Sequence, residues 1–440
     1  MKKLRIFPAI VIFLALPIFF SCGEKPGLIN LDTDGYGRTT LDNGITVLIN
    51  HDEMTSLTAA RILIGGGVLT ETAENNGITN LMTRMLLKGN AEMTADEITE
   101  RLDFLGANIS IDCFRDYSAI SFVSLSENFE EVLAIISKSV ISPVFPEEEL
   151  VKLKHEIEGN IKASDDNQSQ ASDKLFWRTI YGNQGYGLPT PGTIETVNSV
   201  MVDDIKEHYQ KYIGGRNIIF SVSTDLPADL MMNLITGYLG TIKQEAETIP
   251  APSLVLQKEK EGFISNDRNQ SFIYMGAVLD HPAPREVASL GLLNEIMGGT
   301  TSSRLWYLRQ KEKLAYTIYT QYRLDKYDAV FRAAIGTDTS KVSRALASLN
   351  REWAAMVKEG ITETELADAR VNMKNTLIYY IDRKSNRTNN MAYYEYIGYG
   401  YRFVTDLINM ADDITMAELN TFIGTNFTEQ RKFTSVVGKM

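Results

Sequence analysis

Three polar side chains on one predicted helix share a single face. Asn80, Thr83 and Arg84 are spaced at i, i+3 and i+4 within the stretch 77–89, GITNLMTRMLLKG. At this spacing, histidine and glutamate side chains would form a zinc-binding face. Asparagine is a poor zinc ligand, arginine carries a charge that repels the metal, and threonine cannot act as a general base. This face is therefore predicted to bind no metal.

Other residues that do chemistry are scarce or unsuitably spaced. The sequence contains no HxxxH, HExxH, CxxC or GxSxG motif, although it has four histidines, His51, His155, His208 and His281. Cys113 lies in an alternating stretch, which favours a buried apolar residue over a nucleophile. No autonomous catalytic site is predicted from these residues.

The helix with the polar face must itself pack on a core. Its apolar residues recur at i, i+3, i+4, i+7 and i+8, and they are Ile78, Leu81, Met82, Met85 and Leu86. Strands are predicted around it at 45–50, 57–64, 108–115, 118–125 and 217–223. Helices are predicted from the capping box 94–97, over 129–140 and over 147–164. The three glycines 65–67 lack the spacing of a phosphate-binding loop and predict a turn or bulge.

This order of elements recurs later in the chain. Residues 242–256 are charged and then rich in Pro, Ala and Ser, which is typical of a linker. After it, a helix, two strands and a second helix are predicted at 302–313, 316–322, 329–335 and 340–357. Two more capping boxes begin at Thr362 and Thr415. A repeat of about 200 residues predicts two homologous α+β domains, 37–241 and 257–440.

The residues around the polar face carry a family resemblance. The stretch resembles the zinc helix of the insulinase (pitrilysin) family of metallopeptidases, G-x-x-H-x-x-E-H-M-L-x-K-G, through Gly77, Met85, Leu86, Lys88 and Gly89. The resemblance places Asn80 and Arg84 at the two histidine positions and Thr83 at the position of the glutamate. It implies a fold of two α+β domains similar to those of processing peptidases and LuxS-like metalloenzymes.

The third zinc ligand of the family is a glutamate on a later helix. By the resemblance, Asn160 stands at that position. A substitute metal site made by His155, Glu156 and Glu158 is an alternative, but a solvated helix face explains these residues better.

The stretch 298–316 resembles the C-terminal signature of the same family. In that signature an arginine and a tyrosine seven residues apart complete the active site from the second domain, and they correspond to Arg309 and Tyr316. A guanidinium and a phenol can donate hydrogen bonds to a substrate carbonyl and to a developing oxyanion. Without the resemblance, an ion pair of Arg309 with Glu312 and an ordinary strand residue at 316 would be expected.

The N-terminus has the features of an export signal. A positive segment precedes the apolar run 6–20, so that residues 1–22 are predicted to be a signal peptide. The run ends in Ser21-Cys22, which resembles a bacterial lipobox with Cys22 as the lipidated residue, followed by a tether at 23–36. An ordinary secretory signal cleaved nearby is the alternative. The chain is thus expected to be lipid-anchored in a bacterial cell envelope and to face the periplasm.

Composition limits the classes of partner. The 440 residues are 44% hydrophobic and 23% charged, as in a globular protein, and the formal net charge is −12. This charge argues against nucleic acid and against an anionic lipid surface as the main partner. Contact with a membrane is expected through the lipid anchor alone.

Loss of the zinc residues combined with retention of the Arg/Tyr pair suggests a function. Some members of the family resemble split enzymes, in which one chain carries zinc and a homologous chain carries the pair. The resemblance implies a non-catalytic subunit without a cofactor of its own, whose HxxEH-containing partner binds zinc and cleaves peptides. One alternative is a peptide-binding scaffold lipoprotein without a role in proteolysis. Another is an autonomous hydrolase with unrecognised ligands.

Overall fold

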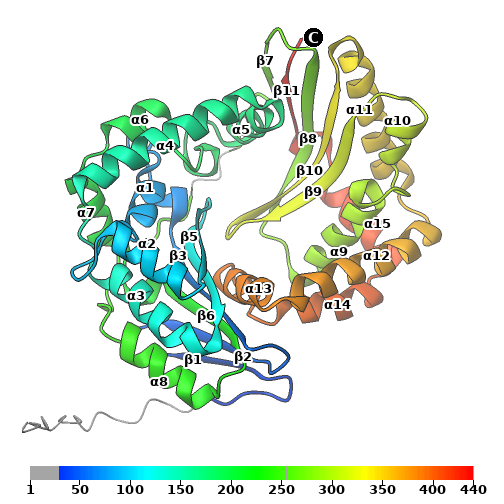
Figure 1. The fold of residues 1–440 in the computed structure, drawn as a ribbon. Coiled ribbons are helices and arrows are strands. Elements are labelled where there is room, and N and C mark those ends of the chain that lie inside the picture. Colours follow the sequence, from blue (N-terminus) through cyan, green and yellow to red (C-terminus); the bar gives the residue numbers. More distant parts are fainter. Residues whose placement is uncertain (1–28, 253–255, 440) are drawn as a thin grey trace, which may run out of the picture.

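The structure is a computed structural model that describes residues 29–252 and 256–439 (Figure 1). The predicted signal peptide 1–22, the lipidation site Cys22 and the first part of the predicted tether lie outside these residues. So do residues 253–255 of the predicted linker. Of the helices in the described ranges, none is both long and apolar enough to cross a bilayer.

The first half of the chain is built on a six-stranded sheet. In chain order its strands are β1 (Tyr36–Thr40), β2 (Thr46–His51), β3 (Leu57–Gly65), β4 (Asn108–Cys113), β5 (Tyr117–Leu125) and β6 (Ile218–Thr224). Their order in the sheet is β1-β2-β6-β3-β5-β4, and only the β2–β6 pair is parallel.

One face of this sheet carries the main core of the half. The helices of the half are α1 (Ile78–Met85), α2 (Ala95–Phe104), α3 (Phe129–Ile141), α4 (Glu147–Asp166), α5 (Gln168–Tyr181), α6 (Ile194–Ser199), α7 (Val202–Tyr212) and α8 (Ala228–Leu239). All of them except α5 add buried side chains to a cluster centred on Ile62, Phe122 and Phe220 of the strands. Alternating side chains of each strand point to opposite faces, so the other face needs a separate cover.

The second half repeats this topology around a five-stranded sheet. Its strands are β7 (Glu261–Ile264), β8 (Gln270–Asp280), β9 (Thr317–Leu324), β10 (Asp328–Asp338) and β11 (Lys432–Val437), in the order β7-β11-β8-β10-β9. The β7–β11 pair is parallel and the others are antiparallel. Both the order and the directions match β2-β6-β3-β5-β4. The prediction of two homologous α+β domains is confirmed.

The helices of the second half are α9 (Pro284–Asn294), α10 (Trp306–Gln310), α11 (Val342–Glu359), α12 (Glu363–Asp382), α13 (Lys384–Tyr396), α14 (Phe403–Asp413) and α15 (Met416–Asn426). Short 3-10 turns at 67–70, 126–128, 185–187, 215–217, 339–341 and 429–431 join elements in both halves. The capping boxes predicted at Thr94, Thr362 and Thr415 are present at the starts of α2, α12 and α15.

One predicted helix is much shorter than expected. A helix over 302–313 was expected, but α10 covers only Trp306–Gln310 and is preceded by a π-helical turn at Glu295–Gly299. The reason is local: residues 300–305 form turns in which the Ser303 hydroxyl donates to the Thr300 carbonyl, and Lys313 takes the left-handed conformation at φ 53°. The glycine run 65–67 forms the predicted turn, with φ 127° at Gly66 and 51° at Gly67.

The two halves exchange a helix. Helix α5 of the first half packs on β8 and β11 of the second sheet, and α13 of the second half packs on β3 and β6 of the first (Figure 1). Buried aromatic residues of both halves pack at this interface, among them Phe176 and Trp177 of α5 and Phe272 and Phe433 of the second sheet. The predicted bounds 37–241, 242–256 and 257–440 stay predictions, since each half's sheet is covered by a helix of the other.

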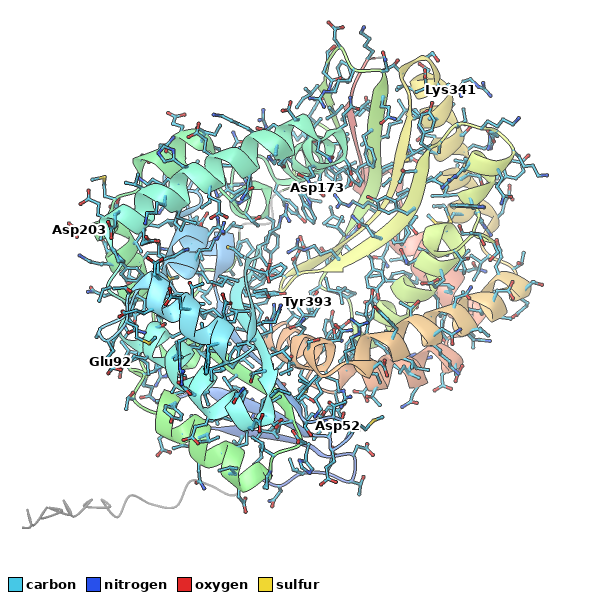
Figure 2. All side chains as sticks on the ribbon, viewed as in Figure 1. Asp52, Glu92, Asp173, Asp203, Lys341 and Tyr393 are labelled. Atoms are coloured by element: carbon cyan, nitrogen blue, oxygen red, sulfur yellow. The ribbon has the colours of Figure 1, made fainter. Side chains whose placement is uncertain are left out.

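Buried polar contacts hold α13 on the first sheet. Lys384 donates to the carbonyls of Thr55 (2.8 Å) and Leu57 (2.9 Å), and Arg387 pairs with Asp52 at 2.7 Å. At the opposite end of α13, the ring of Tyr393 lies 6.1 Å from that of Tyr117 in the first half, tilted by 52°. Figure 2 places Asp52 and Tyr393 at these two ends of the interface.

A second contact joins the halves at their strand turns. Asp116, between β4 and β5, is 1% exposed and accepts hydrogen bonds from the Tyr186 hydroxyl (2.5 Å) and from the Lys326 backbone N–H (2.7 Å). Lys326 lies in the turn between β9 and β10. The equivalent hairpins of the two sheets therefore meet tip to tip.

Candidate functional site

A buried carboxylate anchors the helix that carries the polar face. Glu71 accepts hydrogen bonds from the backbone N–H groups of Gly77 (2.8 Å) and Thr79 (2.9 Å) and from the Asn76 amide (2.7 Å). These are the free N–H groups at the start of α1, which favour a negative charge. Burial nevertheless raises the pKa of Glu71 above its ordinary value. Gly77 has φ 98° and touches the backbone of the 191–192 turn, which leaves no room for a side chain.

A buried histidine also contacts the start of α1. The Nε2 atom of His208, on α7, lies 3.0 Å from the Thr79 hydroxyl, and burial lowers the pKa of His208 to about 4. The imidazole is therefore neutral at physiological pH and joins α7 to α1. Neither Glu71 nor His208 was singled out by the sequence as part of this region. An acidic residue shortly before a predicted helix was the available signal for Glu71.

The three polar residues of α1 do not all face the same way. Thr83 is fully buried, and its hydroxyl donates to the Thr79 carbonyl (2.7 Å) and lies 3.0 Å from the Ser118 hydroxyl on β5. Asn80 and Arg84 are partly exposed. The expectation that the three side chains converge is wrong for Thr83, because its hydroxyl bonds to the preceding turn of its own helix.

Arg84 is paired with a carboxylate of the neighbouring helix. Its Nη2 lies 2.5 Å from Oε1 of Glu156 on α4. Asn160 lies one helical turn after Glu156 and is exposed. Helix α4 thus approaches α1 as the resemblance implies, but a guanidinium–carboxylate pair joins them.

The residues at these positions do not fit a zinc ion. A zinc site needs three or four unprotonated nitrogen, sulfur or carboxylate donors at one point. Here Thr83 is committed to the helix backbone, Arg84 brings a positive charge, and Glu156 pairs with it. Of the substitute ligands, His155 is exposed and Glu158 pairs with Lys162 at 2.5 Å. Within residues 29–252 and 256–439, no three His, Cys, Asp or Glu side chains are grouped as metal ligands would be.

The Arg/Tyr pair lies in the other half. Arg309 is exposed on α10, and its guanidinium lies over the Trp306 ring at 4.6 Å from the centroid. Tyr316 is 58% exposed, just before β9, and its backbone N–H donates to the Gly336 carbonyl at 2.9 Å. In the part of the chain that the structure describes, neither side chain has a hydrogen-bond or ion-pair partner.

The simpler interpretation of Arg309 was an ion pair with Glu312, and the structure contradicts it. Glu312 pairs instead with Arg351 of α11 at 2.6 Å and accepts a hydrogen bond from Ser348 at 2.7 Å. These contacts hold the loop after α10 against α11 and leave the guanidinium of Arg309 available on the surface.

The chain does not bring its two candidate regions together. Helix α1 lies in the first half and α10 at the far edge of the second, on opposite sides of the space between the halves (Figure 1). None of Asn80, Arg84, Arg309 and Tyr316 lines the cavity of about 990 Å³ next to α5. In this arrangement Arg309 and Tyr316 cannot serve a reaction at α1 of the same chain.

A cavity of about 990 Å³ is lined by residues of α5, of the 187–196 segment and of the second sheet. Its inner wall includes Arg115, Asp173, Trp177, Tyr274 and Arg332. Figure 2 shows Asp173 on the side of α5 that faces the second half. This cavity was not predicted from the sequence, because its residues come from distant segments: Arg115 and Arg332 are more than 200 positions apart.

Cys113 agrees with its sequence interpretation. The side chain is partly buried beside its own turn, and its thiol lies 3.7 Å from the Phe114 carbonyl. Burial raises the pKa of the thiol well above its ordinary value, so a nucleophilic thiolate is disfavoured.

Comparison with known proteins identifies the family. Residues 46–194 match the family model described as "Insulinase (Peptidase family M16)", and residues 199–373 match "Peptidase M16 inactive domain". Together they cover most of the chain.

Similar proteins occur in several bacteria. The chain is 23% identical over 395 residues to "Uncharacterized zinc protease YmxG" of Bacillus subtilis (strain 168), covering 89% of this chain and 96% of that protein. It is 22% identical over 361 residues to "Non-peptidase homolog YmxG" of Helicobacter pylori, covering 82% and 83%.

Solved structures share the fold. A peptidase M16 inactive domain from Pseudomonas fluorescens superimposes with a TM-score of 0.84 at 18% identity, over 92% of this chain and 98% of that one. A protease from Helicobacter pylori gives a TM-score of 0.83 at 18% identity, over 91% and 99%. Together with the fold, the two family-model matches establish that the chain belongs to the insulinase family, peptidase family M16.

Proposed function

We propose that this chain is the zinc-free subunit of a heterodimeric M16 peptidase. In the assembly, a homologous chain with an intact HxxEH motif binds zinc and cleaves a peptide, and this chain supplies Arg309 and Tyr316 to that peptide. The assembly is held in the cell envelope by a lipid on Cys22 and faces the periplasm. The N-terminal sequence supports this location.

The observation that carries the proposal is the contrast between the two regions. At α1, the Thr83 hydroxyl is bonded to its own helix, Arg84 is paired with Glu156, and Asn80 is a poor zinc ligand. At α10, Arg309 and Tyr316 are exposed, and the carboxylate nearest to Arg309 in sequence is taken by Arg351. The positions on α1 thus lack suitable zinc ligands. The second half keeps two hydrogen-bond donors, the side chains of Arg309 and Tyr316, which have no hydrogen-bond or ion-pair partner among the described residues.

The two donors suit the charge that develops during peptide hydrolysis. Attack of a zinc-bound water on a peptide carbonyl builds negative charge on the carbonyl oxygen. A guanidinium and a phenol hydroxyl can donate to that oxygen or to the neighbouring backbone carbonyl. Because α10 lies far from α1 in its own chain, the reaction that these donors serve belongs to the partner.

The test mixes this chain with the HxxEH-containing homologue from the same genome. We expect the isolated, tag-free chain to bind no stoichiometric zinc and to cleave no peptide, and the mixture to be active. Arg309→Ala or Tyr316→Phe should lower the kcat of the mixture by about 10²–10³ for the loss of one oxyanion donor. Tyr307→Phe is the matched control, since Tyr307 is on the same helix and is 53% exposed.

Full activity of the mixture with both variants would refute the role in trans. A mixture that forms a complex but has no activity would favour a peptide-binding scaffold. Zinc and turnover in the isolated chain would refute the proposal altogether and indicate an autonomous hydrolase.

A further inference from the structure

The cavity between the halves contains an arginine whose charge is not matched by a carboxylate. Arg115, between β4 and β5, is 7% exposed and lines the cavity. Its Nε donates to the Tyr186 carbonyl at 2.9 Å, and its guanidinium lies over the Trp177 ring at 3.9 Å from the centroid. Among the described residues, no Asp or Glu forms an ion pair with it. A buried cation without a counter-charge is costly, so this arrangement calls for an explanation.

The guanidinium of a second buried arginine lies 5.6 Å from the centroid of the same Trp177 ring. Arg332, on β10, is 8% exposed and pairs with Asp173 of α5 at 2.5 Å. When the Gln321 amide is oriented with its oxygen toward Arg332, that oxygen accepts a hydrogen bond from Nε of Arg332 at 2.7 Å. Its Nη1 is buried and has no partner among the described residues. This nitrogen is enclosed by protein atoms, so Arg332 borders the cavity without offering it a free donor.

Asp173 cannot neutralise both arginines. Its Oδ1 already accepts from Nη2 of Arg332 and lies 3.3 Å from the indole Nε1 of Trp177. Arg323 borders an adjoining space and is paired with Asp325 at 2.7 Å. The pairs Arg332–Asp173 and Arg323–Asp325 cancel, and the charge of Arg115 is left over. Burial lowers the pKa of Arg115 only to about 10, so the guanidinium is still charged at neutral pH.

The rest of the lining is mixed: it has an aromatic and apolar part, described next, and polar residues that include Ser169, Gln170 and Thr193. Trp177 lies beneath the Arg115 guanidinium, and the Tyr274 and Tyr319 hydroxyls lie 3.2 Å apart on the second sheet. Pro189 and Leu188 close another side. A volume of about 990 Å³ is at the upper end of the range for small-molecule sites.

We propose that this cavity binds a ligand that carries a carboxylate next to an apolar group, with the guanidinium of Arg115 as the carboxylate-binding group. A guanidinium presents its N–H groups in a planar fork that matches the two oxygens of a carboxylate. The aromatic wall takes the apolar group. An amino acid or the C-terminus of a short peptide has this chemistry. The inference goes beyond the proposed function, because it needs neither a partner nor catalysis.

The test is calorimetric titration of the purified full chain with two probes that differ only in charge. N-acetylphenylalanine carries the carboxylate, and N-acetylphenylalanine amide does not. We expect the acid to bind and the amide to bind about ten- to a hundredfold more weakly, which is the usual effect of losing hydrogen bonds to a charged group. Arg115→Gln should weaken binding of the acid by a similar factor. Arg178→Gln is the matched control, because Arg178 lines the same cavity but is exposed at its mouth.

Each outcome decides the proposal. Equal binding of acid and amide, or no binding of either, would overturn it, and so would an equal loss in Arg115→Gln and Arg178→Gln, which would indicate general attraction of anions. Competition by inorganic phosphate as strong as by the acid would also overturn the assignment to carboxylates. If Arg115→Gln does not fold, Arg115→Lys keeps the charge above Trp177 without the planar fork, and it should still bind the acid more weakly than the wild type does. The comparison of the two probes on the wild type needs no variant.

Discussion

The buried carboxyl at the junction of the two hairpins should make the protein less stable as the pH rises. Asp116 accepts hydrogen bonds from Tyr186 and from the Lys326 backbone, but it is 1% exposed and close to Asp325. Burial, followed by repulsion from Asp325, raises the pKa of Asp116 from 3.8 to about 7. In the unfolded chain the same group has its ordinary pKa.

The sign follows from counting protons. Between pH 4 and 7 the folded protein keeps a proton on Asp116 that the unfolded chain has lost, so the free energy of unfolding falls as pH rises. One unit of pKa difference corresponds to about 1.4 kcal/mol, which gives roughly 3 kcal/mol between pH 5 and 7. His208 acts in the opposite direction, since its lowered pKa of about 4 makes stability rise with pH until the ordinary value of 6.5 is passed.

A comparison with Asp116→Asn isolates the aspartate. The variant cannot ionise but keeps a carbonyl acceptor, and the contribution of His208 is the same in both proteins. We expect the two to have similar free energies of unfolding by urea at pH 5, and the variant to be more stable by roughly 3 kcal/mol at pH 8. Asp203→Asn is the control, because Asp203 is 93% exposed on α7 (Figure 2). If wild type and Asp116→Asn keep a constant difference from pH 5 to 8, the assignment of the raised pKa to this buried site is wrong.

Two further perturbations test the helix exchange and the predicted anchor. Phe433 is fully buried on β11 beneath α5, so Phe433→Ala should lower the free energy of unfolding in urea by about 3–5 kcal/mol. Phe104 is 78% exposed, so the control Phe104→Ala should change it by under about 0.5 kcal/mol. Equal effects would contradict the packing of α5 on the second sheet. Cys22→Ser should move the chain from the membrane fraction to the soluble fraction of lysed cells, while Cys113→Ser should not; a soluble wild type would contradict lipidation.

The local features of the fold could be predicted because they depend on neighbours in sequence. The capping boxes at Thr94, Thr362 and Thr415 need a hydroxyl and a carboxylate three residues apart, and all three formed where expected. The recurrence of helix, strand, strand and helix indicated the duplication, and the sheet orders confirm it. The helix predicted at 302–313 is short because local hydrogen bonds of Ser303 hold a turn where the helix was expected to begin.

The features that depend on distant contacts could not be predicted. The apolar residues of α5 and α13 indicate that each helix is buried, but the same pattern would suit either sheet. Arg115 and Arg332 are separated by more than 200 positions, and each alone resembles an ordinary surface arginine in the sequence. The partner of Arg84 was equally hidden, because Glu156 belongs to another helix. Residue types at the degenerate zinc site could be judged from chemistry alone, whereas what those residues bind instead required the structure.

The exchanged helix has a consequence for biosynthesis. The inner face of the first sheet, with Leu48, Leu63, Ala119 and Ile219, is covered by Met391 and Ala392 of α13. Strand β6 ends at Thr224, and α13 begins at Lys384, so roughly 160 further residues must be translated before that apolar face can be shielded. Until then the nascent chain exposes an apolar surface of the kind that chaperones bind. Complete folding of the first half therefore depends on residues in the last quarter of the chain.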